Sequence, residues 1–195
     1  MRIGRRISGL IGAAVYDALM WPLEAAWGRG WREPLWEGIA GRVLEIGVGT
    51  GANIPFYPRE ARVVGVDLGA GMLARARRKA ARTGAAVELI EADIHSLPFG
   101  EGEFDYVVGS FVLCSVRDPL AALGEVRRVL HPGGEARFLE HVRPRDELLG
   151  RILERLAPHF AKRTGELFPV AGFEVLSEKA LDKRGLVRLF RLRRA

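Results

Sequence analysis

Short β-branched runs alternate with segments of helical periodicity along most of this chain. The runs predict strands at 42–46, 62–67, 86–91, 104–110, 135–142, 172–181 and 185–193. Helical periodicity covers residues 71–83, 118–130 and 147–156. Gly84 is placed to end the first of these helices, while Asp118 and Pro119 are placed to begin the second. The sequence His-Pro-Gly-Gly at 131–134 predicts a turn before the fifth strand.

This alternation of strands and helices indicates an α/β fold, with a mostly parallel sheet and helices on both faces. In such a sheet the ligand binds beyond the carboxyl ends of the strands, where the strand order reverses. The chain has 195 residues, 48% of them hydrophobic, which suits one α/β domain with a sizeable core. We therefore expect functional residues in the loops after the first four strands.

A glycine-rich loop follows the first predicted strand, in the sequence VLEIGVGTG at 43–51. Glycine at every second position lets the chain turn sharply and lets a ligand approach the backbone. The spacing differs from the GxGxxG of dinucleotide-binding enzymes, and Glu45 at the strand end would repel a diphosphate. An acid suits a cationic ligand such as S-adenosylmethionine, which carries an ammonium and a sulfonium group. The alternative is an ordinary connection between a strand and a helix.

Two further acids lie where the next two strands end. Asp67 comes about 20 residues after the first glycine, where a carboxylate can accept hydrogen bonds from both ribose hydroxyls. Asp93 follows the third strand, where it can accept from the adenine amino group while Ile94 packs on the ring. The alternatives are a helix N-cap at Asp67 and an exposed turn residue at Asp93. Acids at three consecutive strand ends favour S-adenosylmethionine as the ligand.

With these motifs the chain resembles the class I S-adenosylmethionine-dependent methyltransferases over residues 16–142. The matching stretches are LEIGVGTGANIPFYP, VVGVDLGAGML, EADIHSLPF, FDYVVGSFVLCSV and EVRRVLHPGGEARFLEHV. The resemblance implies a Rossmann-like three-layer sandwich, with a mostly parallel seven-stranded sheet that ends in an antiparallel hairpin. The residues expected to bind the cofactor are Glu45, Gly47, Val48, Gly49, Gly51, Asn53, Asp67, Leu68, Met72, Asp93, Ile94, His95, Ser110 and Phe111.

Two subgroups of that class are similar to this chain in FVLCSVRDP and FLEHVRP. They are the bacterial phosphatidylethanolamine N-methyltransferases and the animal membrane-associated thiol methyltransferases. The resemblance implies a methyl acceptor that is a lipid or hydrophobic small molecule, with phosphatidylethanolamine as one candidate. The alternatives are a soluble thiol, hydroxyl or natural product, or a cofactor-binding regulator without transfer activity. Residues 157–164 look shortened relative to the thiol methyltransferases, which leaves the acceptor pocket undefined.

Methyl transfer needs a base only if the nucleophile arrives protonated. His141 follows Glu140 at the end of the fifth strand and is the candidate base, with simple packing as the alternative. Tyr16, in the N-terminal segment, is the second residue expected at the catalytic site, where it would close over the cofactor. Cys114 is expected to act as a small hydrophobic residue.

The formal net charge of +6 is compatible with an acidic small molecule, anionic lipid or nucleic acid, but codon bias or thermal adaptation of an arginine-rich chain is the favoured explanation. Nucleic acid is not the expected partner, because residues 109–112 lack the Asn/Asp-Pro-Pro-aromatic pattern of base methyltransferases. No cysteine or histidine cluster has the spacing of metal ligands, so no metal is expected. The single cysteine indicates a reducing, cytoplasmic location.

Residues 1–36 form a segment distinct from the expected methyltransferase domain at 37–195. On a helical wheel its apolar residues gather on one side and Arg2 and Arg5 lie opposite, and all four tryptophans fall within it. Such a stripe predicts peripheral contact with the anionic inner face of a membrane. It is equally compatible with a lid that folds over the cofactor cleft. No stretch of the sequence reaches the length of a membrane span.

Overall fold

The computed structural model describes residues 28–143, 151, 155 and 164–194. These residues form a mixed sheet of seven strands in the order β3-β2-β1-β4-β5-β7-β6, and the chain divides into two compact units, residues 1–94 and 95–195. All seven strands expected from the sequence are present, and the last two pair in antiparallel fashion. The α/β fold with its terminal antiparallel hairpin is therefore confirmed.

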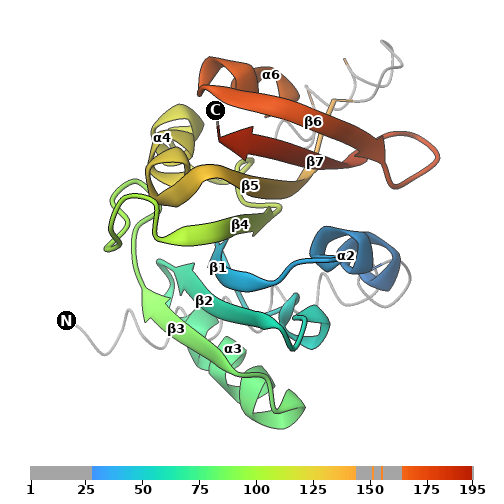
Figure 1. The fold of residues 1–195 in the computed structure, drawn as a ribbon. Coiled ribbons are helices and arrows are strands. Elements are labelled where there is room, and N and C mark those ends of the chain that lie inside the picture. The colour runs from blue at the N-terminus through green and yellow to red at the C-terminus, as the bar shows by residue number, and fades with distance from the viewer. Residues whose placement is uncertain (1–27, 144–150, 152–154, 156–163, 195) are drawn as a thin grey trace. The chain divides into compact units, whose positions relative to one another are not determined.

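The first unit contains three parallel strands, with β2 (Ala61–Asp67) between β1 (Gly41–Ile46) and β3 (Val87–Glu91) (Figure 1). The register pairs Ile46 with Val66, and Asp67 with Glu91, so the carboxyl ends of the three strands share one edge. Helix α2 (Arg29–Trp36) precedes β1, and the short 3₁₀ helix η2 (Ile54–Phe56) follows the glycine loop. The acids expected at the strand ends thereby come to the same edge.

Helix α3 (Ala70–Thr83) packs against β2 and β3 and matches the predicted helix 71–83. Gly71, Leu73 and Ala76 make up its buried face. The helix ends at Gly84, whose left-handed φ of 70° and N–H bond to the carbonyl of Ala80 complete the predicted C-cap.

The second unit begins with β4 (Phe104–Ser110), which pairs in parallel with β5 (Leu130–His141). Between them lies α4 (Pro119–Val129), capped by Asp118, whose carboxylate accepts from the N–H of Ala121 at 3.0 Å. The turn predicted at 131–134 falls inside the bounds of β5. There the register shifts: Leu130 pairs with Phe104, and regular pairing resumes at Glu135 opposite Tyr106. The turn residues therefore form an irregularity within the strand.

The hairpin of β6 (Phe173–Ala180) and β7 (Val187–Arg194) completes the second unit, with β7 antiparallel to β5. Helix α6 (Thr164–Val170), which the sequence did not predict, packs on β6 and on α4. Phe168 of α6 contacts Phe138 and Phe190, with ring centroids 5.4 and 5.0 Å away, and all three are buried. The helix predicted at 147–156 lies outside the described residues except for 151 and 155.

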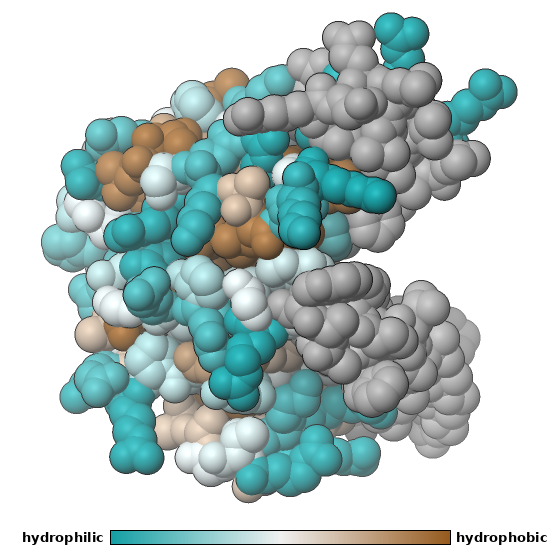
Figure 2. Space-filling view, turned by 90° about the vertical axis from the view of Figure 1, so that its right-hand side faces the viewer, coloured by the Kyte–Doolittle hydropathy of each residue, from teal (hydrophilic) through white to brown (hydrophobic). Residues whose placement is uncertain are grey.

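Figure 2 shows one face of the molecule, on which the described surface is mainly hydrophilic and hydrophobic residues form small separate groups. Among the described residues, Leu68 and Val170 are the most exposed large hydrophobic side chains, at 67% and 71%. No helix in the described part of the chain is both long enough and apolar enough to cross a bilayer.

Candidate functional site

The glycine loop after β1 adopts the backbone conformation that its sequence predicts. Gly47, Gly49 and Gly51 have φ values of 64°, 56° and 79°, in the left-handed region that residues with a Cβ rarely adopt. A Cβ on Gly51 would also lie 3.2 Å from the Cα of Ala76 in α3. The loop therefore turns sharply beside α3, in a backbone conformation that requires glycine.

Asp67 holds this loop against the end of β2. Its Oδ2 atom accepts a hydrogen bond from the N–H of Gly49 at 2.9 Å, and its Oδ1 accepts from the N–H of Gly69 at 2.8 Å. A carboxylate offers about four acceptor sites, so both oxygens can accept further bonds. The geometry therefore permits Asp67 to anchor the loop and to receive two ribose hydroxyls at once.

The remaining candidates in the first unit surround the same edge. Val48 is buried and its N–H donates to the carbonyl of Val66 at 3.0 Å. The N–H of Ala92 donates to the carbonyl of Asp67 at 3.2 Å, which ties the segment containing Asp93 and Ile94 to the end of β2. Asp93 is exposed and Ile94 is partly exposed. Leu68 is exposed and Met72 lies in the first turn of α3. Tyr16 lies outside the described residues.

Glu45 is the centre of a buried polar network at the end of β1. Its Oε1 accepts from Nδ2 of Asn53 at 2.7 Å, and its Oε2 accepts from the hydroxyl of Tyr57. Asn53 in turn accepts from the guanidinium of Arg32 in α2, at 2.5 Å. Glu45, Asn53 and Arg32 are each at most 3% exposed. The ring of Trp36 packs on Tyr57 at 4.5 Å and closes the network on the α2 side.

Burial controls the protonation of this network. It raises the pKa of Glu45 to about 7, although the hydrogen bonds from Tyr57 and Asn53 and the charge of Arg32 act in the opposite direction. Burial and the adjacent Glu45 raise the pKa of Tyr57 well above its ordinary value. Glu45 therefore changes charge near neutral pH, whereas Tyr57 stays a neutral donor. Sequence reasoning missed Arg32 and Tyr57, because no local motif links a residue of α2 to a strand end.

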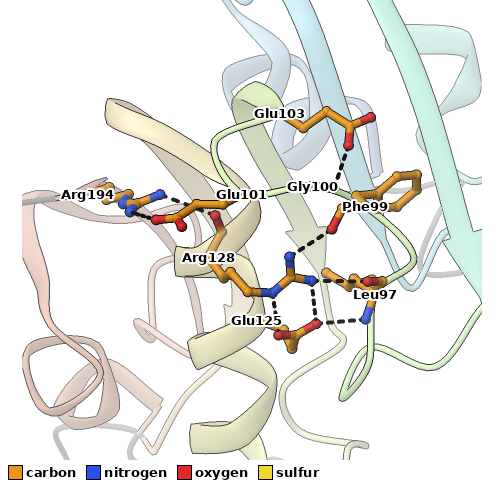
Figure 3. Close-up of polar contacts among 8 residues, drawn as sticks. All are labelled: Leu97, Phe99, Gly100, Glu101, Glu103, Glu125, Arg128 and Arg194. Atoms are coloured by element: carbon orange, nitrogen blue, oxygen red, sulfur yellow. Dashed lines mark hydrogen bonds and ion pairs between the residues drawn. The ribbon is translucent and has the colours of Figure 1, made fainter.

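In the second unit, a loop at 95–103 leads into β4 and is held by Arg128 of α4 (Figure 3). Arg128 donates to the carbonyls of Phe99 and Leu97 at 2.7 and 3.0 Å, and forms a two-nitrogen ion pair with Glu125. Glu125 also accepts from the N–H of Leu97 at 2.8 Å. At the start of this loop Nε2 of His95 accepts from the N–H of Asp118 at 3.4 Å. The loop that contains the candidate His95 is thus fixed to α4 at both ends.

Phe111 and His141 lie face to face at the carboxyl ends of β4 and β5. Their ring centroids are 4.3 Å apart with an angle of 26° between the planes. Phe111, which directly follows the partly exposed Ser110, is the sole non-glycine residue of the described chain with positive φ, at 54°. Backbone strain of this kind clusters at active sites, ligand clamps and switch regions. Burial lowers the pKa of His141 to about 4, against the charge of Asp182, so its imidazole is neutral at pH 7.

Glu140, which precedes His141, fixes the turn that contains Phe111. It is fully buried, and its Oε1 accepts from the N–H groups of Val112 and Leu113 at 3.0 and 2.9 Å. Sequence reasoning missed this role, although an acid in an otherwise apolar strand is an indication of buried hydrogen bonding. Cys114 is partly exposed, and its thiol contacts the carbonyl of Phe111 at 3.3 Å.

The residues of the first unit fit S-adenosylmethionine by the chemistry of their donors and acceptors. Asp67 offers acceptors for hydroxyl groups, the glycine loop allows a ligand to approach its backbone closely, and Glu45 supplies negative charge when ionised. No group of three or more histidine, cysteine or acidic side chains suited to a metal ion occurs in the described ranges.

Comparison with known proteins identifies the family. Residues 44–138 match the methyltransferase domain family. A phosphatidylethanolamine N-methyltransferase from Cereibacter sphaeroides is 41% identical over 103 residues, covering 52% of this chain and 51% of its own length. A ubiquinone/menaquinone biosynthesis C-methyltransferase from Geobacter sulfurreducens is 35% identical over 192 residues, covering 92% of this chain and 75% of its own.

The chain thus spans about half the length of the first relative and three quarters of the second. Among solved structures, an S-adenosylmethionine-dependent methyltransferase from Aquifex aeolicus has the same fold. It superposes with a TM-score of 0.71 at 18% identity, over 91% of this chain and 98% of that one. All three comparisons name methyltransferases: the relative that matches nearly the whole chain, the domain family and the structure with the same fold. The chain belongs to the class I S-adenosylmethionine-dependent methyltransferases.

Proposed function

We propose that this protein transfers the methyl group of S-adenosylmethionine to a lipid or another hydrophobic small molecule. The observation that supports methyl transfer from this cofactor is the hydrogen bond by which Asp67, at the end of β2, holds the glycine loop that follows Glu45. Support for a hydrophobic acceptor comes from the relatives, one named for phosphatidylethanolamine and one for ubiquinone and menaquinone biosynthesis.

In this proposal, different residues of the first unit bind different parts of the cofactor. Asp67 accepts the ribose hydroxyls, and the loop from Gly47 to Gly51 receives the methionine part. Glu45, when ionised, attracts the positive charge of that part, and Asp93 and Ile94 bind the adenine. A supporting detail is that the N–H of Ala92 already bonds the carbonyl of Asp67, which keeps the two ligand segments in register.

S-adenosylmethionine supplies a methyl group that its positive sulfur has already activated, so the protein contributes mainly alignment. The proposed aligning elements of the second unit are Phe111 and His141. Glu140 holds the turn of Phe111 through two backbone N–H groups, and Phe111 stacks on His141. A neutral imidazole can accept a proton from an acceptor nucleophile.

Methyl transfer can be tested with cofactor labelled in the methyl group. The purified protein is mixed in turn with phosphatidylethanolamine vesicles, a demethylated quinone, an alkyl thiol and a catechol, with Asp67→Ala as the control of weakened cofactor binding. We expect label in a lipid or quinone and in neither soluble compound. Label in the thiol or catechol alone would reject the hydrophobic acceptor. Tight cofactor binding without label in any acceptor would favour a non-catalytic binding protein.

A further inference from the structure

The turn that joins β6 to β7 lies beside the carboxyl end of β5. In the antiparallel pair of β5 and β7, His141 is opposite Val187, and the N–H of Val142 donates to the carbonyl of Leu186 at 2.9 Å. The connection at 181–186 therefore starts at the same edge of the second unit as His141 and extends past the end of β5 (Figure 1). Ligands of α/β folds bind at the carboxyl ends of the parallel strands.

Asp182 gives this turn a fixed shape. Its Oδ1 accepts from the N–H of Val187 at 2.7 Å, and its Oδ2 accepts from the N–H of Arg184 at 2.9 Å. Gly185, with a left-handed φ of 66°, donates to the carbonyl of Asp182 at 3.1 Å. The charge of Asp182 also acts on His141, where it opposes the lowering of the imidazole pKa by burial. The residues that follow Asp182 are thus held near the candidate base.

Lys183 and Arg184 occupy the tip of the turn. Both are exposed, and neither side chain makes a hydrogen bond or an ion pair within the described part of the protein. By contrast, Arg188 at the start of β7 is paired with Glu178. Residues 178–188 include four basic and two acidic residues, so this end of the hairpin carries a net positive charge. Exposed cations need no ligand in general, but these two stand at the ligand edge, next to the candidate base.

A phosphate group matches this pair of cations. A guanidinium binds phosphate through two parallel N–H groups, and an ammonium supplies a compact charge that phosphate also accepts. An exposed cation holds a free ion only weakly, because solvent and salt screen the attraction. The same contact becomes effective when the phosphate belongs to a molecule that the protein already holds at a neighbouring point. A methyl acceptor whose nucleophile lies at His141 is such a molecule.

We propose that Lys183 and Arg184 bind a phosphate group of the methyl acceptor, which makes the acceptor a phospholipid and not an uncharged quinone. This inference rests on the proposed function, and it chooses between the two acceptor classes that the relatives suggest. The phosphate on the turn and the nucleophile at His141 are then separated by a few bonds, as in a phosphate ester of an amino alcohol. The rigid turn orients the headgroup, and the exposed tip leaves the rest of the lipid outside the protein.

Amide chemical shifts measure binding at the turn directly. The protein is saturated with S-adenosylhomocysteine, which carries no methyl group to transfer, and is titrated with glycerophosphoethanolamine or with ethanolamine. We expect glycerophosphoethanolamine to shift the amide signals of residues 182–187 and to bind at least about 10-fold more tightly than ethanolamine, which lacks the phosphate. Inorganic phosphate should bind more weakly than glycerophosphoethanolamine, because it has no second point of attachment. Absence of shifts at the turn, or equal binding of the two amines, would overturn the proposal.

Arg184→Gln and Lys179→Gln form a matched pair of variants. Each removes one exposed cation from the same hairpin, but Lys179 lies within β6, opposite Leu189 and away from the tip. Arg184→Gln should weaken glycerophosphoethanolamine about 5-fold, and Lys183→Gln combined with it about 10-fold or more, whereas Lys179→Gln should stay within about twofold. The Tm should be unchanged in all three, because the altered side chains are exposed. Equal losses in Arg184→Gln and Lys179→Gln would indicate a general effect of charge, and the proposal would be wrong.

Label transfer separates this inference from the proposed function. Phosphatidylethanolamine and a demethylated quinone are presented in micelles of an uncharged detergent. The double variant Lys183→Gln/Arg184→Gln should lower kcat/KM for phosphatidylethanolamine about 10-fold and leave cofactor affinity unchanged. Label in the quinone and none in the phospholipid would overturn the inference and leave the proposed function standing. Label in neither lipid would reject the proposed function and with it the role in acceptor binding, while the amide shifts decide the phosphate site independently.

Discussion

The backbone N–H of Gly49 donates to Oδ2 of Asp67 over 2.9 Å, which joins the loop after β1 to the last residue of β2. The other oxygen of Asp67 accepts from Gly69 at 2.8 Å, where α3 is about to begin. One carboxylate thus fixes the loop, the strand end and the start of the helix together. The same carboxylate is proposed to hold the ribose, so its loss would affect both the loop and the ligand.

Asp67→Ala should weaken S-adenosylmethionine binding by roughly 1.5–3 kcal/mol, the range for hydrogen bonds to a charged group. The reason is that both ribose hydroxyls lose their acceptor while the loop loses an anchor. Calorimetry of the folded variant measures the effect. Glu88→Gln is the matched control, since it removes an equal charge from the exposed surface of β3 in the same unit.

A cofactor analogue that lacks the ribose 2′-hydroxyl separates the two roles of Asp67. The analogue should bind the unaltered protein less tightly than the natural cofactor, and Asp67→Ala should bind the two alike. This is a double-mutant cycle between residue and ligand, in which the coupling measures the direct contact. If the analogue loses the same binding free energy, relative to the natural cofactor, in both proteins, Asp67 acts through the loop alone.

The strands and the glycine loop were predictable because their causes are local. A β-branched run followed by alternating glycines determines the end of β1, and an acid at the end of the next run marks β2. Helix α6 was not predictable, because it has seven residues and includes Gly165 and Pro169, which oppose helix propensity. Its stability comes from Phe168, which packs on rings contributed by β5 and β7.

The buried network of Glu45 shows a second limit of sequence reasoning. The acid was visible at the strand end, but its pKa depends first on its burial and then on Tyr57 and Arg32, which lie 12 and 13 residues away in opposite directions. Such contacts are set by how α2 packs beside η2, and no spacing rule encodes them. Glu140 is similar, because its partners Val112 and Leu113 precede it by 28 and 27 residues.

Residues 1–12 lie outside the described structure, and their predicted role comes from the sequence alone. Deletion of 1–12 should abolish sedimentation with anionic vesicles, because each arginine near the surface contributes about 1 kcal/mol. Binding of the full chain should be lost at high salt, as expected for an electrostatic contact. Neutral vesicles are the control. A full chain that stays in the supernatant at low salt, or a truncated chain that still sediments, would leave only the lid interpretation.

Glu45→Gln should make the protein more stable than the unaltered chain above pH 7. The folded pKa of Glu45, about 7, lies above its unfolded value of 4.5, so between these pH values the folded state binds the extra proton. Stability from this group is therefore complete below pH 4.5 and falls by about 3 kcal/mol as pH rises to 7. Glutamine does not titrate; its carbonyl oxygen keeps an acceptor for Asn53, and its amide group can donate to the hydroxyl oxygen of Tyr57. Urea midpoints from pH 4 to 8 measure the difference.

Replacement of His141 tests whether it acts as the base. Because its pKa is lowered to about 4 by burial, its imidazole is neutral across the pH range of ordinary assays. Turnover with an identified acceptor should therefore show no inflection near pH 6.5 from this group. His141→Ala should reduce turnover by roughly 100-fold or more and leave cofactor affinity unchanged. If turnover stays within a few-fold of the original, the acceptor is deprotonated elsewhere or arrives without a proton.

The effect of His141 on stability should oppose that of Glu45. Its folded pKa of about 4 lies below the ordinary value of 6.5, so the unfolded chain binds the extra proton between these pH values. The contribution of His141 to the free energy of unfolding is full above pH 6.5 and decreases by about 3 kcal/mol as the pH falls to 4. In the unaltered protein the two trends nearly cancel between pH 4.5 and 6.5. The stability of Glu45→Gln should therefore increase with pH in this range. The stability of His141→Phe, which keeps a ring against Phe111, should decrease with pH. Parallel curves for the two variants would contradict both pKa assignments.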